Sequence, residues 1–242
     1  MYSTEIAKGT IHEVTLTSKH LGTSERILVY TPARYSALYT YPVLYVQDGD
    51  DYLSLGRLAS LLDELAANRE ISDVITVFLP VDKAKRYDRY HPLGKEHVAY
   101  KRFLAEEVVS YVERDFAAHP LGGARTLIGD SLGGVVSLFT ALTYPNTFGQ
   151  VASQSGAFDD SMCTIVENGS SLHQLSVYME VGTRENAVET SRGTLDLLQG
   201  NQLMREALEK KGATLRYELF EGDHTWGYWQ ASLPNILRHF YG

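Results

Sequence analysis

The chain has 242 residues, of which 44% are hydrophobic and 21% charged, a balance typical of a globular protein with a sizeable core. Its 22 Lys and Arg residues against 30 Asp and Glu give a net charge of -8, which argues against nucleic acid as a partner. The N-terminus lacks a signal-peptide pattern and no apolar stretch is long enough to span a membrane, so we expect no membrane partner. The single cysteine, Cys163, excludes an internal disulfide and favours a reducing, cytoplasmic location.

The first half of the chain contains several short segments typical of β-strands, either alternating in polarity, as at 10–18, or continuously apolar, as at 42–47. These strand-like runs occupy residues 10–18, 26–31, 42–47 and 74–79. A stripe of four leucines at helical spacing predicts a helix facing the core, and it consists of Leu55, Leu58, Leu62 and Leu65. A long helix is predicted over residues 97–116.

The second half alternates strand-like and helix-like segments. Strands are predicted at 126–128, 150–154, 177–181 and 215–220, and helices at 135–142, 192–211 and 226–240. A strand pair followed by β–α alternation predicts one α/β domain over residues 1–242, with a mostly parallel central sheet and helices on both faces. Ligands in such sheets bind at the carboxyl ends of the strands, where we expect the loops after Gln47, Pro80, Gly129, Val181 and Phe220 to gather.

The hexapeptide Gly129-Asp130-Ser131-Leu132-Gly133-Gly134 stands between a predicted strand and a predicted helix. Strand, Gly-flanked turn with a central serine, then helix is the context of the G-x-S-x-G nucleophile elbow. The flanking glycines let strand and helix approach closely and leave the serine hydroxyl exposed above the sheet. The pattern therefore predicts Ser131 as a nucleophile, the alternative being a plain Gly-rich turn.

A serine nucleophile needs a base within hydrogen-bond reach and a group that orients the base. In α/β-hydrolases the chain order is Ser, acid, His, and only His173, His224 and His239 follow the serine. His239 lies inside the last predicted helix, and no strand leads into His173. His224 stands in a loop between a strand and the last helix, so we predict it as the base.

The orienting acid should lie in a loop that follows a strand. Glu185 does so after residues 177–181, and we favour it over Glu180, which is inside the strand, and over Asp223, which is adjacent to the base. An oxyanion hole needs two preorganised N–H donors. One should be the N–H of Leu132, and the second should come from the loop 47–52.

Five stretches resemble the esterase D and enterochelin esterase-like family of α/β-hydrolases. They are Tyr41-Pro42-Val43-Leu44-Tyr45-Val46-Gln47-Asp48-Gly49, Gly129 to Gly134, Ser153-Gln154-Ser155-Gly156, Gly182-Thr183-Arg184-Glu185 and Gly222-Asp223-His224-Thr225-Trp226. The resemblance spans residues 9–241. It implies a serine carboxylic-ester hydrolase in which Ser131, His224 and Glu185 form a catalytic triad, with the N–H groups of Asp50 and Leu132 as the oxyanion hole.

The resemblance also covers a segment around Arg86 that lies beside the active site in the family, and either a substrate contact or a structural role is open for this arginine. Further candidates for substrate contact are Asp51, Tyr52 and Trp226. Only about twenty residues separate Gly156 from the next strand, so any cap must be small. An open cleft with aromatic walls predicts short-chain or aromatic acyl esters as substrates, with siderophore lactones implied by the resemblance.

Other chemistries have no motif in this chain. The sequence has no His-Glu-x-x-His or Cys-x-x-Cys spacing, no G-x-G-x-x-G and no Walker A, so we expect neither a catalytic metal nor a nucleotide cofactor. Two alternatives to a hydrolase stay open. One is an acyltransferase on the same scaffold, and the other is a catalytically silent binding homologue.

Overall fold

A computed structural model describes residues 6–190 and 193–242. Its centre is an eight-stranded sheet in the order β1-β2-β4-β3-β5-β6-β7-β10. The strands are β1 Thr10–Thr17, β2 Ser24–Thr31, β3 Val43–Gln47, β4 Ile75–Leu79, β5 Arg125–Asp130, β6 Gln150–Gln154, β7 Ser176–Gly182 and β10 Thr214–Phe220. The β1–β2 and β2–β4 pairs are antiparallel and the remaining pairs are parallel, which confirms the predicted mostly parallel sheet.

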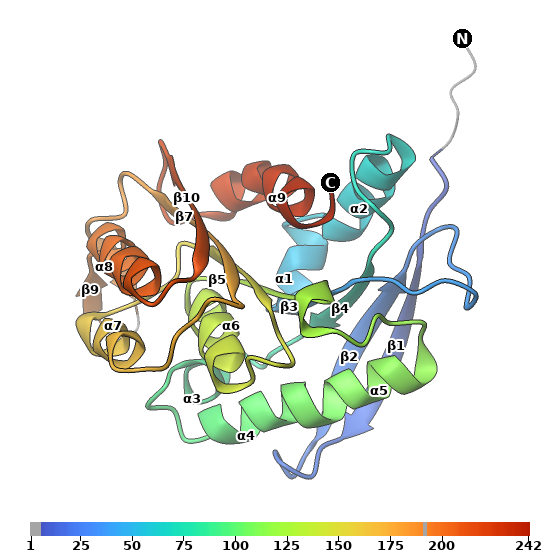
Figure 1. Cartoon of the computed structure of the whole chain (residues 1–242), viewed down its shortest axis with the longest axis horizontal. Helices are drawn as coiled ribbons and strands as arrows, with labels where there is room; N and C mark the ends of the chain where they lie inside the picture. Colours follow the sequence, from blue (N-terminus) through green and yellow to red (C-terminus); the bar gives the residue numbers. More distant parts are fainter. Residues whose placement is uncertain (1–5, 191–192) are drawn as a thin grey trace.

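Helices cover both faces of this sheet, as predicted (Figure 1). One face carries α3 Arg86–Tyr90, α4 His97–Arg102, α5 Val109–Asp115, α6 Leu132–Thr143, α7 Asp160–Glu167 and α8 Leu197–Lys210. The other face carries α1 Gly49–Ser54, α2 Leu58–Ala67 and α9 Trp226–Tyr241. Because successive strand residues point to opposite faces, Val43 and Tyr45 join one core while Leu44 and Val46 join the other. Strands buried on both faces explain the continuous apolar runs of the sequence.

The predicted long helix over residues 97–116 is one helical rod with an irregular middle. Between α4 and α5, Phe103–Val108 forms a π-helical segment. The wider turn changes the phase of the helix, so that Tyr100 before it and Val112 after it both face the same core. Periodicity alone predicts the rod and its core face but not this extra width.

Two element predictions are wrong. Leu55 was expected on the core stripe, but it follows α1, lies outside α2 and is 50% exposed, whereas the other three leucines are buried. The helix predicted over 192–211 begins only at Leu197, because the carboxylate of Asp196 caps it by accepting from the N–H of Gln199 (2.8 Å). The preceding residues form β9 Gly193–Leu195, which pairs with β8 Val188–Thr190. Arg192 lies outside the described residues.

Candidate active site

Ser131 lies in a sharp turn between β5 and α6, as the elbow pattern predicted. Its backbone is strained, with φ 51° and ψ −120°. A Cβ on Gly129 would come within 2.3 Å of the Gly133 carbonyl carbon, so the first glycine is needed for the close approach of strand and helix. The chain therefore turns at once from strand into helix and leaves the serine half-buried at the carboxyl end of the sheet.

His224 and Glu185 meet at the same edge of the sheet. His224 follows β10 and Glu185 follows β7, and these two strands are parallel neighbours. The Nδ1 atom of His224 lies 2.6 Å from Oε2 of Glu185. The carboxylate is fully buried, whereas the imidazole retains 17% exposure of its side chain. The second ring nitrogen, Nε2, is therefore the one available for chemistry with a ligand.

The carboxylate of Glu185 is fixed on its other oxygen by two donors. Oε1 accepts from the hydroxyl of Ser155 (2.7 Å) and from the N–H of Gly182 (2.8 Å). The same hydroxyl accepts from the indole N–H of Trp229 (2.9 Å), and the indole ring lies edge-on against His224 with centroids 4.8 Å apart. Ser155 follows β6 with a positive φ of 50°. Sequence reasoning assigned no role to Ser155 or Trp229, although Ser155 belongs to one of the family-like stretches.

A second buried carboxylate, Glu180, lies beside this network. Its Oε1 accepts from the Gln154 amide (2.8 Å) and the Ser232 hydroxyl (2.5 Å). Burial raises the pKa of Glu180 from its ordinary value of 4.5 to about 7, against the effect of these two hydrogen bonds. Glu180 lies within β7 and binds Gln154 and Ser232. It does not orient His224, as its position in the strand predicted.

Glu180→Gln should abolish a pH-dependent loss of stability. Because the pKa of Glu180 in the folded protein is raised, its contribution to stability is fully present below about pH 4.5 and is lost as the pH rises through about 7. Glutamine does not titrate, so the free energy of unfolding of the wild type should fall by roughly 2 kcal/mol relative to the variant between pH 5 and pH 8. Urea unfolding of the wild type and the variant at pH 5 and pH 8 measures these free energies. A difference between the two proteins that is the same at both pH values would contradict the prediction.

The two predicted oxyanion donors are at the first turns of two helices. Asp50 is the second residue of α1 and Leu132 is the first residue of α6. The N–H groups at such positions have no partner within their own helix and can bind an anion. Asp48, which precedes α1 in a left-handed conformation (φ 50°), has a buried side chain, and its N–H donates to the hydroxyl of Tyr90 (3.1 Å).

Arg86 binds protein groups in this structure. Its Nε donates to Asp48 Oδ1 (2.9 Å), and its Nη2 donates to Asp48 Oδ2 (2.9 Å) and to the carbonyl oxygen of Asp130 (3.2 Å). Burial and the charge of Asp48 raise the pKa of Asp130 to about 7, and the positive charge of Arg86 acts in the opposite direction. Of the two roles left open by the sequence, this geometry supplies the structural one.

The other proposed substrate contacts differ in accessibility. Tyr52 is fully buried and donates to Gln154 Oε1 (2.8 Å), so its ring cannot meet a ligand in an open cleft and this prediction is wrong. Trp226 packs edge-on over that ring, with centroids 4.8 Å apart, and is half-buried. Asp51 keeps 30% exposure of its side chain and pairs with Lys83. Trp226 and Asp51 stay candidates for substrate contact.

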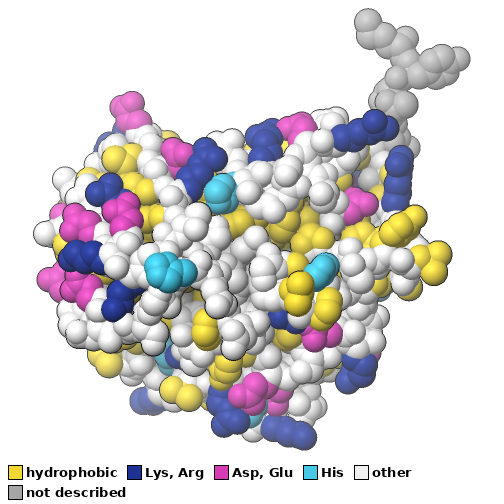
Figure 2. Space-filling view, viewed as in Figure 1, with side chains coloured by type: hydrophobic (Ala, Val, Ile, Leu, Met, Phe, Trp, Pro, Cys, Tyr) yellow, Lys and Arg dark blue, Asp and Glu magenta, His cyan; other side chains and the backbone are white. Residues whose placement is uncertain are grey.

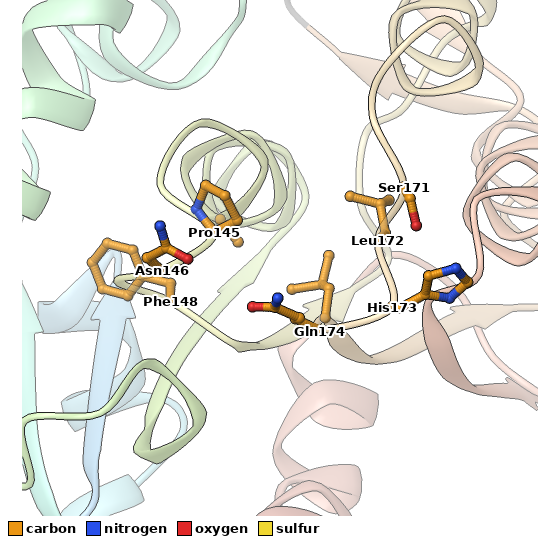
Figure 3. Close-up of a pocket in the computed structure, with 9 residues that line it drawn as sticks. Pro145, Asn146, Phe148, Ser171, Leu172, His173 and Gln174 are labelled. Atoms are coloured by element: carbon orange, nitrogen blue, oxygen red, sulfur yellow. The ribbon is translucent and has the colours of Figure 1, made fainter.

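The structure separates the two rejected histidines from the site. His173 lines a pocket of about 290 Å³ between the end of α6 and the loop before β7 (Figure 3). This pocket is also lined by Phe148, two residues before β6, and by Leu175, directly before β7, so it lies at the amino ends of the strands. His239 packs on Tyr178 from within α9. Both histidines are therefore unsuited to act on Ser131.

Two negative findings concern the described residues, 6–190 and 193–242. No group of three or more His, Cys, Asp or Glu side chains among them is arranged to hold a metal ion. No helix among them is long and apolar enough to cross a membrane.

Figure 2 shows Lys and Arg interspersed with Asp and Glu over the end formed by α7 and α8, where Lys210 pairs with Glu167 (2.8 Å). Burial, together with neighbouring carboxylates, raises the pKa of the Cys163 thiol to about 11.

A mostly parallel sheet covered by helices on both faces, with a strained serine between strand and helix, defines an α/β-hydrolase fold. The family described as "Putative esterase" matches residues 18–240, and the chain belongs to this family. It is thus an enzyme of the carboxylic ester hydrolase class.

Comparisons with individual proteins agree with this family. The chain is 41% identical to "Uncharacterized protein YjcH" of Bacillus subtilis (strain 168), over 95% of this chain and 97% of that protein. Its fold is similar to that of an enterochelin esterase from Shigella flexneri (TM-score 0.82, 19% identity), matching 95% of this chain but only 57% of the other. It is also similar to a ferulic acid esterase from the anaerobic fungus Anaeromyces mucronatus (TM-score 0.79, 19% identity, 98% and 92% of the two chains).

Proposed function

We propose that the protein is a serine esterase that works through an acyl-enzyme. Ser131 is the nucleophile, His224 the base and Glu185 the orienting acid, and the N–H groups of Asp50 and Leu132 form the oxyanion hole. The observation that carries the proposal is the 2.6 Å contact between His224 Nδ1 and a fully buried carboxylate, at the sheet edge where the strained serine lies. The proposed location is the cytoplasm, since the single cysteine forms no disulfide within the chain.

In the acylation step, Ser131 Oγ attacks the ester carbonyl carbon while His224 Nε2 takes the hydroxyl proton. The negative charge that develops on the carbonyl oxygen is stabilised by the two N–H groups at the first turns of α1 and α6. Glu185 holds Nδ1–H and stabilises the imidazolium that forms. Collapse of the tetrahedral intermediate breaks the ester C–O bond, and His224 returns its proton to the departing alcohol.

In the deacylation step, water replaces the alcohol. His224 Nε2 removes a proton from this water, which attacks the acyl carbon through a second tetrahedral intermediate. Collapse of this intermediate breaks the bond to Ser131 Oγ, which takes the proton back from His224, and the carboxylic acid is released. The partial exposure of the imidazole fits this role, because solvent reaches its side chain.

A fluorophosphonate probe tests the proposed function directly, because it forms a stable bond only with an activated serine. The wild type should be labelled stoichiometrically, and peptide mapping should locate the label at Ser131. Ser137→Ala is a matched control, since Ser137 is fully buried within the following helix. Absence of labelling in the wild type, or a label elsewhere, would contradict the proposal.

The proposed substrates are short-chain or aromatic acyl esters. The connection from β6 to β7 contains a single helix, the eight-residue α7, which is too little chain for a deep acyl tunnel. The aromatic surface near the base includes Trp226 and Tyr228, and the latter accepts from Arg184 (2.7 Å). Aromatic groups beside an arginine suit flat, electron-rich acyl groups. Siderophore lactones are the specific candidate, supported by the fold shared with an enterochelin esterase.

Activity on p-nitrophenyl esters should decline with acyl length. We expect the highest kcat/KM with acetyl to butyryl or with aromatic acyl groups, and a lower value with decanoyl, because an open cleft leaves a long chain in water. Initial rates over the ester series measure this preference. An optimum at decanoyl or longer would refute the open cleft, and absence of catecholate trilactone hydrolysis above background would remove siderophore lactones as the candidate.

A further inference from the structure

Arg86 connects the two chain segments that lead into α1 and α6, the helices that carry the proposed oxyanion donors. Its guanidinium binds the carboxylate of Asp48 and the carbonyl oxygen of Asp130. Asp48 lies two residues before Asp50 at the start of α1, and Asp130 lies two residues before Leu132 at the start of α6. The guanidinium, which belongs to a third element, α3, thus joins the two residues that lie two positions before each proposed donor.

From this we infer that Arg86 is a positioning residue that sets the separation of the two oxyanion N–H groups. The inference rests on the proposed function, since it assumes that these two groups bind the oxyanion. A planar guanidinium with several N–H donors in fixed directions can hold a carboxylate and a carbonyl at once, whereas a lysine ammonium has no such fork.

The surroundings of the guanidinium keep it in place. The ring of Tyr90 lies against it, 5.4 Å from the guanidinium carbon to the ring centroid, and the hydroxyl of the same tyrosine accepts from the N–H of Asp48. A Cβ on Gly133 would lie 3.1 Å from Asp48 Oδ2, so the missing side chain lets the carboxylate approach the first turn of α6. The loop before α1 therefore packs directly on the helix that begins after the nucleophile.

Loss of this connection should affect the transition state more than substrate binding. Displacement of one oxyanion donor costs on the order of 10²–10³ in kcat. Arg86→Met should therefore lower kcat by about that factor while KM changes by less than about threefold. Arg86→Lys should not restore activity, because it keeps the charge but lacks the fork.

The test compares inhibition by phenylboronic acid with steady-state kinetics. Ser131 Oγ adds to the trigonal boron, its proton passes to His224, and the tetrahedral adduct places an oxygen in the oxyanion hole. Binding of this transition-state mimic should weaken in Arg86→Met by a factor similar to the loss in kcat/KM. A second variant, Asp48→Asn, keeps the size of the side chain and should reproduce the effect. It provides the test if Arg86→Met does not fold.

Arg89→Met is the matched control. Arg89 lies on the same short helix and is more enclosed than Arg86, with 3% against 20% exposure of the side chain. It pairs with Glu25 and Glu96 and binds neither Asp48 nor Asp130. In Arg89→Met the affinity for phenylboronic acid, relative to KM, should remain as in the wild type. The inference is overturned if Arg86→Met retains at least half of kcat, if its loss is confined to KM, or if boronate affinity is unchanged. Failure of the proposed function would appear separately, as a wild type that fluorophosphonate does not label.

Discussion

Ser131→Ala should lower kcat for ester hydrolysis by a factor on the order of 10⁴ or more while the protein remains folded. In the proposed mechanism the hydroxyl oxygen of Ser131 forms the acyl bond, so its removal should eliminate the covalent route. Alanine and serine both carry a Cβ atom that disfavours a φ of 51°, so the substitution adds no new backbone strain. Steady-state hydrolysis of p-nitrophenyl acetate measures kcat, and circular dichroism verifies the fold.

The control for this prediction is a serine-to-alanine change within α6, the helix that follows Ser131. Ser137 is fully buried and its hydroxyl has no hydrogen-bond partner among the described residues, so Ser137→Ala should leave kcat close to the wild-type value. A Ser131→Ala variant that keeps a tenth of the wild-type kcat would remove this serine from the mechanism.

Glu185→Gln should lower kcat roughly 10²–10⁴-fold by reversing a hydrogen bond. The N–H of Gly182 can only donate, so the amide oxygen of the glutamine should stay on that side. The amide NH₂ then faces His224 Nδ1 and selects the tautomer with its proton on Nε2. This tautomer cannot take a proton from Ser131. Pre-steady-state hydrolysis of p-nitrophenyl acetate should show the loss in the acylation burst.

Asp223→Asn is the matched carboxylate-to-amide control for the orienting acid. Asp223 is adjacent to His224 in sequence, but it is exposed and accepts from the Thr225 hydroxyl (2.9 Å). Its variant should therefore lose much less activity than Glu185→Gln. If the two losses came out in the opposite order, the orienting role would pass to Asp223.

Strand positions and the elbow were predictable because burial on both sheet faces leaves a direct pattern in the sequence. The apolar run at 74–79 contains β4, Ile75–Leu79, and the glycines around Ser131 correspond to a real close contact between strand and helix. The neighbours Glu185 and His224 were chosen by chain order and loop position, and the structure brings their side chains into contact. These inferences need only local pattern and the topology of a parallel sheet.

Contacts between distant loops were not predictable in the same way. The sequence pattern places Tyr52 in a loop at the site, where an aromatic side chain would be accessible. In the structure Tyr52 belongs to α1, and its buried ring points toward Gln154. Ser155 and Trp229 are 74 positions apart, and no periodicity connects them. The double attachment of Arg86 likewise depends on how α3 packs against the segments before α1 and α6, which the sequence pattern does not encode.

The left-handed backbone at the ends of three parallel strands has a consequence for how this protein evolves. Among the described residues, five that are not glycine have positive φ, and three of these, Asp48, Ser131 and Ser155, follow β3, β5 and β6 at the site. Each such conformation stores about 1 kcal/mol or more, which glycine would release. Selection for heat resistance alone would thus favour glycine at these positions and erode the enzyme, so that only selection for turnover retains their side chains.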